Sequence, residues 1–79
     1  MYHLYILKCA DNSLYTGITV DLARRVAEHN SSKLGAKYTR ARQPVKLVYS
    51  RKLPSRSVAL KAEARIKKLS HSEKLNIIK

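Results

Sequence analysis

Four side chains in the first half of the chain have types and a spacing that suit chemistry on a phosphate group. Tyr5 and Tyr15 each lie in a short run of strand-forming residues, and Arg25 and His29 follow at a spacing that places both on one face of a helix. A guanidinium grips a phosphate through its forked N–H groups, while phenols and an imidazole orient water and handle protons. Together these groups suit hydrolysis of a phosphodiester bond, in which an attacking water must lose a proton.

Each of these residues also has an ordinary structural explanation. Tyrosine favours strands, so Tyr5 and Tyr15 could simply be sheet residues. Arg25 lies on an apolar helical face, where a long basic side chain often covers apolar surface and reaches water. Taken alone, the arginine favours that explanation. The tyrosine runs and His29 reverse the preference, because the spacing of all four residues is then explained at once.

The pattern of apolar and turn-forming residues predicts an α+β fold, in which helices flank a small three-stranded antiparallel sheet in the order ββαβαα. A chain of 79 residues forms one domain at most, so we assign residues 1–79 to a single domain. Thr19 or Asp21 can cap the first helix. We expect strands at 2–9, 14–19 and 45–50, a helix ending near 30, a loop at 31–43, a helix from Ser55 or Ser57 onward, and a terminal helix that starts with the capping box Ser70-His71-Ser72-Glu73.

The hairpin formed by the first two strands decides whether the tyrosines can share a pocket. Side chains alternate across a strand with a period of two. If Cys9 paired with Leu14, Tyr5 and Tyr15 would lie on opposite faces. A three-residue loop that pairs Ala10 with Leu14 would place both tyrosines on one face. The catalytic hypothesis therefore predicts an odd-length loop or a bulge.

The net charge predicts a polyanionic partner. Seventeen lysines and arginines against five acids give a formal charge of +12. No acid lies between His29 and Ala62, and a block of one sign is poorly suited to mere solubility because like charges repel. Nucleic acid is the first candidate. No long amphipathic basic helix covers this block and no apolar run approaches the ~20 residues that span a bilayer, so we expect no membrane partner.

The single cysteine and the N-terminal residues bear on the compartment. Cys9 has no second cysteine to pair with, which favours a reducing compartment, and we interpret it as a small buried hydrophobe. The first residues lack the basic region and the cleavage site of a secretory signal. We therefore expect a cytoplasmic protein.

Glu63 is a further candidate, because it is the only acid between Glu28 and Glu73. On a helical wheel it flanks an apolar stripe, and the alanines on either side leave room for a ligand. A helix would also place it one turn from Lys67, where an exposed ion pair contributes ~0.3–0.5 kcal/mol. Taken alone, the residue does not distinguish a ligand from a surface ion pair.

The chain resembles the GIY-YIG nuclease family. His3-Leu4-Tyr5 stands in place of Gly-Ile-Tyr, and Thr16 stands in place of the isoleucine of Tyr-Ile-Gly. Both tyrosines are kept, so the resemblance implies the fold and the chemistry of the family, and the basic segment 35–40 is similar to a loop of its small stand-alone members. Most of the specificity lies in Tyr15-Thr16-Gly17-Ile18-Thr19, Ala23-Arg24-Arg25-Val26 and Glu28-His29-Asn30.

The resemblance implies a role for each candidate residue. Tyr5 would be the general base, while Tyr15 and His29 would orient water, phosphate or Tyr5. Arg25 would hold the scissile phosphate. Glu63 matches the one glutamate that binds a divalent metal ion in the family, here Mg²⁺ or Mn²⁺, with waters in the other positions. A free phenol titrates near pH ~10, and we expect the positive charge around Tyr5 to lower its pKa.

Other residues are candidates for contact with the nucleic acid. Gly17 lets a ligand or a neighbouring backbone approach closely. Tyr38 could stack on a base, and a solvated loop residue is an equally good explanation for it. The predicted nucleic-acid-binding residues are Gly17, Lys33, Lys37, Tyr38, Arg40 and Arg42.

The sequence therefore predicts a metal-dependent endonuclease that acts on DNA rather than RNA, with a structure-specific role in DNA repair or recombination. A non-catalytic nucleic-acid-binding module with the same fold is the alternative, and a basic structural protein of a ribonucleoprotein particle is a third interpretation. Both explain the charge, but neither explains the five site residues together. We expect no appended targeting domain, so a homodimer or a partner protein would be one source of specificity.

Overall fold

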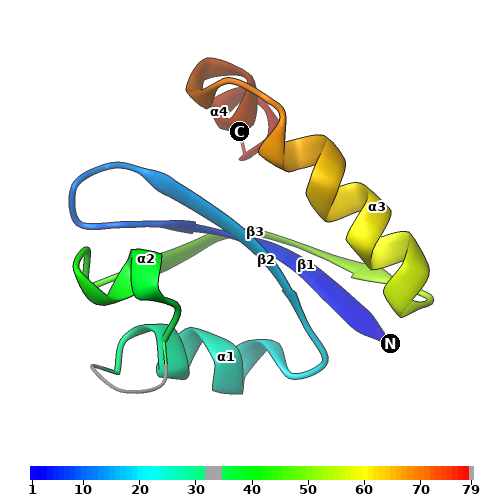
Figure 1. The fold of residues 1–79 in the computed structure, drawn as a ribbon, viewed down its shortest axis with the longest axis horizontal. Helices are drawn as coiled ribbons and strands as arrows, with labels where there is room; N and C mark the ends of the chain where they lie inside the picture. Colours follow the sequence, from blue (N-terminus) through cyan, green and yellow to red (C-terminus); the bar gives the residue numbers. More distant parts are fainter. Residues whose placement is uncertain (32–34, 79) are drawn as a thin grey trace.

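The computed structural model describes residues 1–31 and 35–78, which form a sheet with helices on both sides (Figure 1). The predicted α+β fold and its order are confirmed, with one addition, because a single helical turn, α2, lies within the segment predicted as a loop. The elements are β1 (Tyr2–Lys8), β2 (Leu14–Thr19), α1 (Leu22–His29), α2 (Lys37–Arg40), β3 (Lys46–Leu53), α3 (Arg56–Lys67) and α4 (His71–Ile78). All pairings are antiparallel, in the order β2-β1-β3.

The central strand, β1, is buried on both faces. Leu4, Tyr5, Ile6 and Leu7 are each at most 1% exposed. Leu4 and Ile6 pack with residues of α3 and α4, whereas Tyr5 and Leu7 pack with residues of α1 on the other face. Because helices cover both faces, the strand has a continuous apolar run instead of an alternating pattern.

The β1–β2 hairpin places both tyrosines on the face that α1 covers. Tyr15 lies opposite Leu7, and Leu7 shares the face of Tyr5 because the two are separated by one residue. The shared face confirms the prediction made from the hairpin register. The catalytic tyrosine of the hypothesis therefore has the second phenol as a neighbour.

The loop of this hairpin has the predicted length but a shifted register. The N–H group of Cys9 donates to the carbonyl of Ser13 at 2.9 Å, which leaves three residues in the loop. The predicted Ala10–Leu14 pairing is wrong, because Lys8 pairs with Leu14 instead. Asn12, the last loop residue, has a φ of 69°, a conformation that asparagine adopts more readily than most residues.

Side-chain caps start three of the helices where the sequence predicts them. Asp21, not Thr19, caps α1 by accepting from the Arg24 N–H at 3.1 Å. Ser55 caps α3 in the same way, at 3.2 Å from the Val58 nitrogen. Ser70 and Glu73 bond reciprocally at the start of α4, which confirms the capping box.

Strand β3 is longer than the predicted strand over 45–50. Leu53, predicted to belong to a chain break, pairs with Tyr2 and is buried. The pairing with the full length of β1 extends the strand, so that the break begins at Pro54. Within the described parts of the chain, no helix is long and apolar enough to cross a membrane.

Candidate active site

Tyr5 lies at the centre of the candidate site, and Gly17 makes room for it. The two residues are opposite each other in the β1–β2 pair. A Cβ atom on residue 17 would lie 2.6 Å from the Tyr5 hydroxyl oxygen and 2.8 Å from the adjoining ring carbon. The close approach predicted for Gly17 is therefore to the Tyr5 phenol, which crosses the glycine.

A chain of buried hydrogen bonds runs from Tyr5 through His29 to Thr39. The Tyr5 hydroxyl lies 2.8 Å from Nε2 of His29, and Nδ1 of the same ring lies 2.9 Å from Oγ1 of Thr39. The Thr39 hydroxyl donates its proton to the carbonyl of Ala36 at 3.0 Å. The bond from His29 to Thr39 must then be donated by Nδ1–H. A neutral ring has one N–H, so Nε2 accepts from Tyr5.

Helix α2 brings Thr39 to this position. It starts directly after Gly35, which packs against the end of α1: a Cβ atom there would lie 2.9 Å from both the Glu28 carbonyl oxygen and the His29 Cα. Only glycine allows that approach without a shift. Thr39 and His29 are both fully buried, so the chain of bonds is shielded from water.

Arg25 is held beside Tyr5. Its guanidinium hydrogen-bonds the Tyr5 hydroxyl and forms an ion pair with Glu28 at 2.9 Å. The Arg25 side chain remains 29% exposed, so an anion in solution can reach it. The predicted meeting of Tyr5, Arg25 and His29 is present in the structure.

The pKa of Tyr5 moves in the direction opposite to the one predicted. Burial raises it to about 12, which outweighs the lowering by the hydrogen bond and charge of Arg25. The nearby Tyr15 and Glu63 also raise it. The expectation that positive surroundings would lower this pKa is wrong, because removal from water costs the phenolate more than one adjacent guanidinium returns.

The pKa of His29 moves downward, to about 4. Burial is the main cause, and the charge of Arg25 adds to it. At neutral pH His29 is therefore uncharged and Tyr5 keeps its proton. This protonation state agrees with the tautomer that the bond to Thr39 requires.

A row of aromatic rings leads from the buried phenol to the surface. The Tyr15 ring centroid lies 6.4 Å from that of Tyr5 and 5.0 Å from that of His29. Tyr38 follows at 5.8 Å from Tyr15, and Arg42 lies over its outer ring at 4.0 Å. Tyr38 is 38% exposed, so the row ends where a base can stack.

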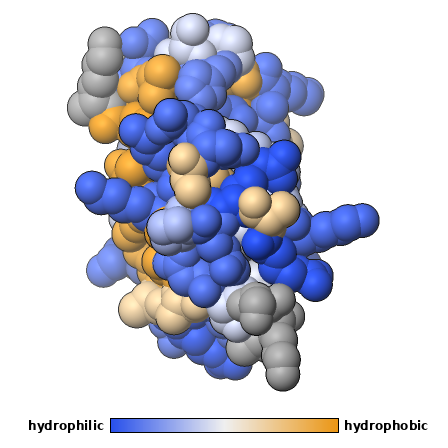
Figure 2. Space-filling view, turned by 90° about the vertical axis from the view of Figure 1, so that its left-hand side faces the viewer, coloured by the Kyte–Doolittle hydropathy of each residue, from blue (hydrophilic) through white to orange (hydrophobic). Residues whose placement is uncertain are grey.

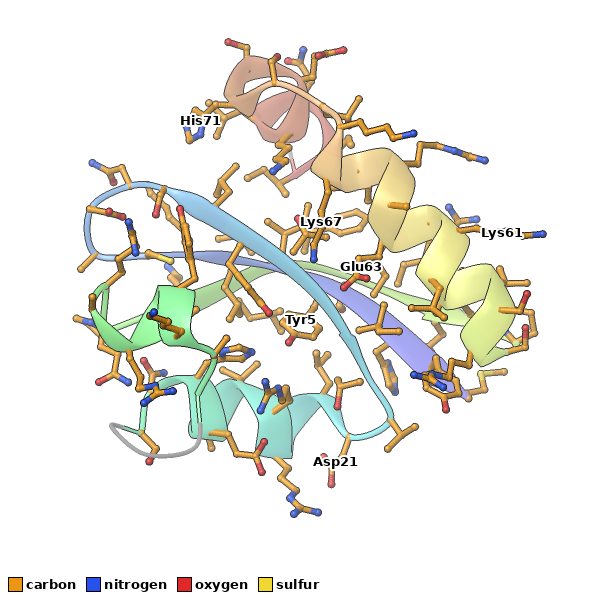
Figure 3. All side chains as sticks on the ribbon, in the orientation of Figure 1. Tyr5, Asp21, Lys61, Glu63, Lys67 and His71 are labelled. Carbon is orange, nitrogen blue, oxygen red and sulfur yellow. The ribbon has the colours of Figure 1, made fainter. Side chains whose placement is uncertain are left out.

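Glu63 approaches from the opposite side of the sheet. Figure 3 shows its side chain extending from α3 toward the strands on the side of Tyr5, and its charge raises the pKa of that residue. Lys67 lies 3.6 Å away in the ion pair that the sequence offered as the ordinary explanation. The Lys67 side chain is half exposed, so this long pair is weak and readily exchanged.

The donor set around Glu63 suits a cation that retains much of its water. Among the described residues, no group of three or more His, Cys, Asp or Glu side chains could enclose a metal ion. Mg²⁺ is commonly held by one or two carboxylates with waters in its remaining positions. The Glu63 side chain is 20% exposed, which leaves room for those waters.

The predicted nucleic-acid-binding residues lie around this site, apart from one. Lys37 and Arg40 are exposed on α2, whereas Arg42 is tied to Asp11 at 3.0 Å. Lys33 lies outside the described residues. The face that carries α2 and the β1–β2 loop is largely hydrophilic, with a hydrophobic strip along one margin (Figure 2).

Two residues of the site escaped the sequence analysis. Thr39 fixes the histidine tautomer, but it lies ten residues from His29 and meets it only because α2 forms. Glu28 pairs with Arg25 and also with Arg24, at 3.2 Å. Its spacing from both arginines along one helix was the available signal.

Comparison with known proteins identifies the class. The model of the GIY-YIG catalytic domain matches residues 1–76. The chain belongs to the GIY-YIG family, and the meeting of its two strand tyrosines with the helix α1 arginine agrees with that assignment.

Similar proteins carry the name UPF0213. A UPF0213 protein of Syntrophus aciditrophicus is 56% identical over 77 residues, covering 98% of this chain and 88% of that protein. A solution NMR structure of a UPF0213 protein from Bacillus halodurans is 44% identical with a TM-score of 0.63, covering 99% of this chain and 83% of that one. A structure from E. faecalis is 43% identical with a TM-score of 0.66, covering 98% and 81%.

The neutral burial of His29 predicts a pH-dependent stability. In the unfolded chain the ring takes up a proton below pH ~6.5, while in the folded protein it does so only near pH 4. The free energy of unfolding is thus fully retained above pH ~6.5 and falls by roughly 3 kcal/mol as the pH drops toward 4. Urea unfolding at a series of pH values measures this loss. His29→Gln should remove this part of the slope, and an unchanged slope in that variant would contradict the assignment.

Proposed function

We propose that this protein is a metal-dependent endonuclease that hydrolyses phosphodiester bonds in nucleic acid, with DNA as the first candidate. The observation that carries the proposal is the position of the Tyr5 hydroxyl, which lies between the guanidinium of Arg25 and Nε2 of His29. A purely structural tyrosine has no need of an arginine and a tautomer-fixed histidine around one buried oxygen. A structure-specific role in repair or recombination is the setting in which such an activity is expected.

The hydrogen bonds define a path for the proton of the attacking water. A phenol with a pKa of about 12 is a poor free base at neutral pH. Tyr5 can instead pass its own proton to Nε2 of His29 while it takes one from the water. The acceptor is then the imidazole, and Tyr5 is a relay. This modifies the role expected from the resemblance, in which Tyr5 alone is the general base.

Binding of the substrate would make this transfer easier. The charge of Arg25 is the second cause of the low pKa of His29. A phosphate on Arg25 brings negative charge that offsets the guanidinium, so the pKa of His29 rises when the substrate is in place. The same contact holds the phosphoryl group beside the Tyr5 hydroxyl.

Glu63 would hold the divalent cation, Mg²⁺ or Mn²⁺. When bound, the cation supplies charge that stabilises the phosphoryl and leaving oxygens. Exchange of the Lys67 ammonium frees the carboxylate for this task. Neutralising Glu63 also removes one of the influences that raise the pKa of Tyr5.

Adjacent arginines on α1 offer a matched test of phosphate binding. Arg24 and Arg25 both pair with Glu28, but the Arg24 side chain is 75% exposed and belongs to neither the Tyr5 nor the His29 contacts. Arg25→Ala should lower DNA cleavage about 100-fold or more, the size of effect seen when one donor to a developing charge is removed. Arg24→Ala should stay within about threefold. Equal losses in the two variants would show that Arg25 acts only through net charge.

Glu63→Gln tests the metal site against Glu73→Gln, which alters the other acid of the C-terminal half. Glu63→Gln should abolish cleavage at every Mg²⁺ or Mn²⁺ concentration, because the amide is a poor ligand for these ions. Glu73→Gln should retain cleavage. Metal-dependent cleavage that persists in Glu63→Gln, or salt-sensitive DNA binding by the wild type with no cleavage under any divalent ion, would contradict the proposal.

Thr39 should act as a positioning residue for His29. Thr39→Val removes the acceptor for Nδ1–H, and loss of a group that orients a reacting histidine typically lowers a rate tenfold or more. Thr39→Ser keeps the hydroxyl and should restore cleavage. Nitrogen chemical shifts of His29 should show Nδ1–H in the wild type and Thr39→Ser, and a change of tautomer in Thr39→Val. If Thr39→Val kept both tautomer and activity, this role would be excluded.

A further inference from the structure

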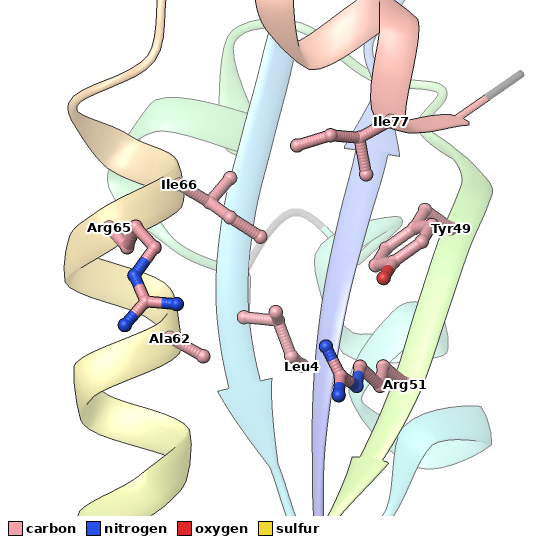
Figure 4. Close-up of a pocket in the computed structure, with 7 residues that line it drawn as sticks. All are labelled: Leu4, Tyr49, Arg51, Ala62, Arg65, Ile66 and Ile77. Atoms are coloured by element: carbon pink, nitrogen blue, oxygen red, sulfur yellow. The ribbon is translucent and has the colours of Figure 1, made fainter.

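A second concave region lies on the other face of the sheet, away from Tyr5 and His29. A cavity of about 230 Å³ opens between α3 and β3, and Figure 4 shows two arginines beside an apolar floor. An adjoining cavity of about 220 Å³ shares Arg51, Ala62 and Arg65 with it. The lining of the first cavity consists of Leu4, Tyr49, Arg51, Ala62, Arg65, Ile66 and Ile77.

The register of the sheet explains how these groups meet. Arg51 lies opposite Leu4 and Tyr49 opposite Ile6, so Tyr49 and Arg51 share the face that α3 covers. Arg65 reaches the same region from α3. The cavity is lined by no acidic residue. Within the described residues, neither Arg51 nor Arg65 takes part in an ion pair.

The size of the cavity limits what can enter it. A cavity of ~150 Å³ accepts a benzene ring, whereas small-molecule sites commonly start near ~300 Å³. A space of about 230 Å³ thus takes one planar ring system and excludes a large ligand. The Tyr49 ring forms one wall and the aliphatic side chains of Leu4 and Ile66 form the floor (Figure 4).

We propose that this groove between α3 and β3 binds one unpaired nucleotide of a nucleic-acid strand, with its base in the cavity and its phosphate on Arg51 and Arg65. Two guanidiniums at the mouth suit a phosphate, and an aromatic wall suits a base that has left its stack. A base enclosed in this way cannot pair with a complementary strand. The protein would therefore favour substrates that contain unpaired nucleotides.

The groove and the candidate active site lie on the two flanks of α3. Glu63 and Arg65 are two residues apart, so their side chains leave the helix roughly 200° apart. The groove depends on the proposed function only for its ligand class. Binding there requires neither a metal ion nor cleavage, so the two proposals can fail separately.

Binding of a fluorescein-labelled oligodeoxythymidylate, followed by anisotropy in EDTA, tests the groove. The variant Arg51→Gln/Arg65→Gln should bind about tenfold more weakly than the wild type. The control Lys52→Gln/Arg56→Gln removes the same charge from the same two elements, but its residues line neither cavity. The control should lose less than about threefold. Equal losses would overturn the proposal in favour of general attraction by charge.

Two further arms test the base-binding cavity itself. Ala62→Leu fills the cavity without changing the charge, and it should weaken binding if its thermal melting remains cooperative. An abasic strand of equal length should bind the wild type more weakly than the oligodeoxythymidylate. Undiminished binding by Ala62→Leu or by the abasic strand would exclude an enclosed base. Displacement of the oligonucleotide by polyglutamate at equal concentration would identify the groove as a site for acidic peptides and overturn the proposal.

Discussion

The hydrogen bond between the Tyr5 hydroxyl and Nε2 of His29 is the contact on which the candidate site depends. It joins the central strand to α1 through two side chains that are almost completely buried, at 2.8 Å. Glycines at 17 and 35 allow it, because each gives way to one of the two partners or to its backbone. Thr39 then decides which nitrogen of the ring is free to accept. Removing water from this bond makes both partners neutral in the resting protein.

That neutrality links the stability of the domain to its proposed chemistry. Burial moves the pKa of Tyr5 up and that of His29 down, so neither group carries charge where charge would be costly. Arg25 is the charged group at the margin of the pair, and it is the group that a phosphate would engage. A substrate therefore changes the electrostatics of the buried pair through one intermediary. The strongly basic surface brings a polyanion to that intermediary without taking part in the proton transfer.

Local sequence signals were sufficient for the elements, because caps, turns and apolar runs act over a few residues. Ser70 with Glu73 and the parity of the β1–β2 loop are examples. Two features depended on tertiary contacts and were missed: the extension of β3 to Leu53 requires its pairing with Tyr2, and α2 forms where Gly35 packs against α1. The site residues could be chosen from spacing. The pKa of Tyr5 could not, because its direction depends on how completely the fold removes the phenol from water.

The most direct measurement is a crystal structure of the protein with a DNA strand and Ca²⁺, a cation that can occupy the site while the strand stays intact. The account predicts one phosphate within hydrogen-bonding distance of Arg25, the cation on Glu63 with Lys67 displaced, and a water at the Tyr5 hydroxyl opposite the leaving oxygen. A strand bound elsewhere on the surface, with Glu63 still paired to Lys67 and no phosphate on Arg25, would contradict it.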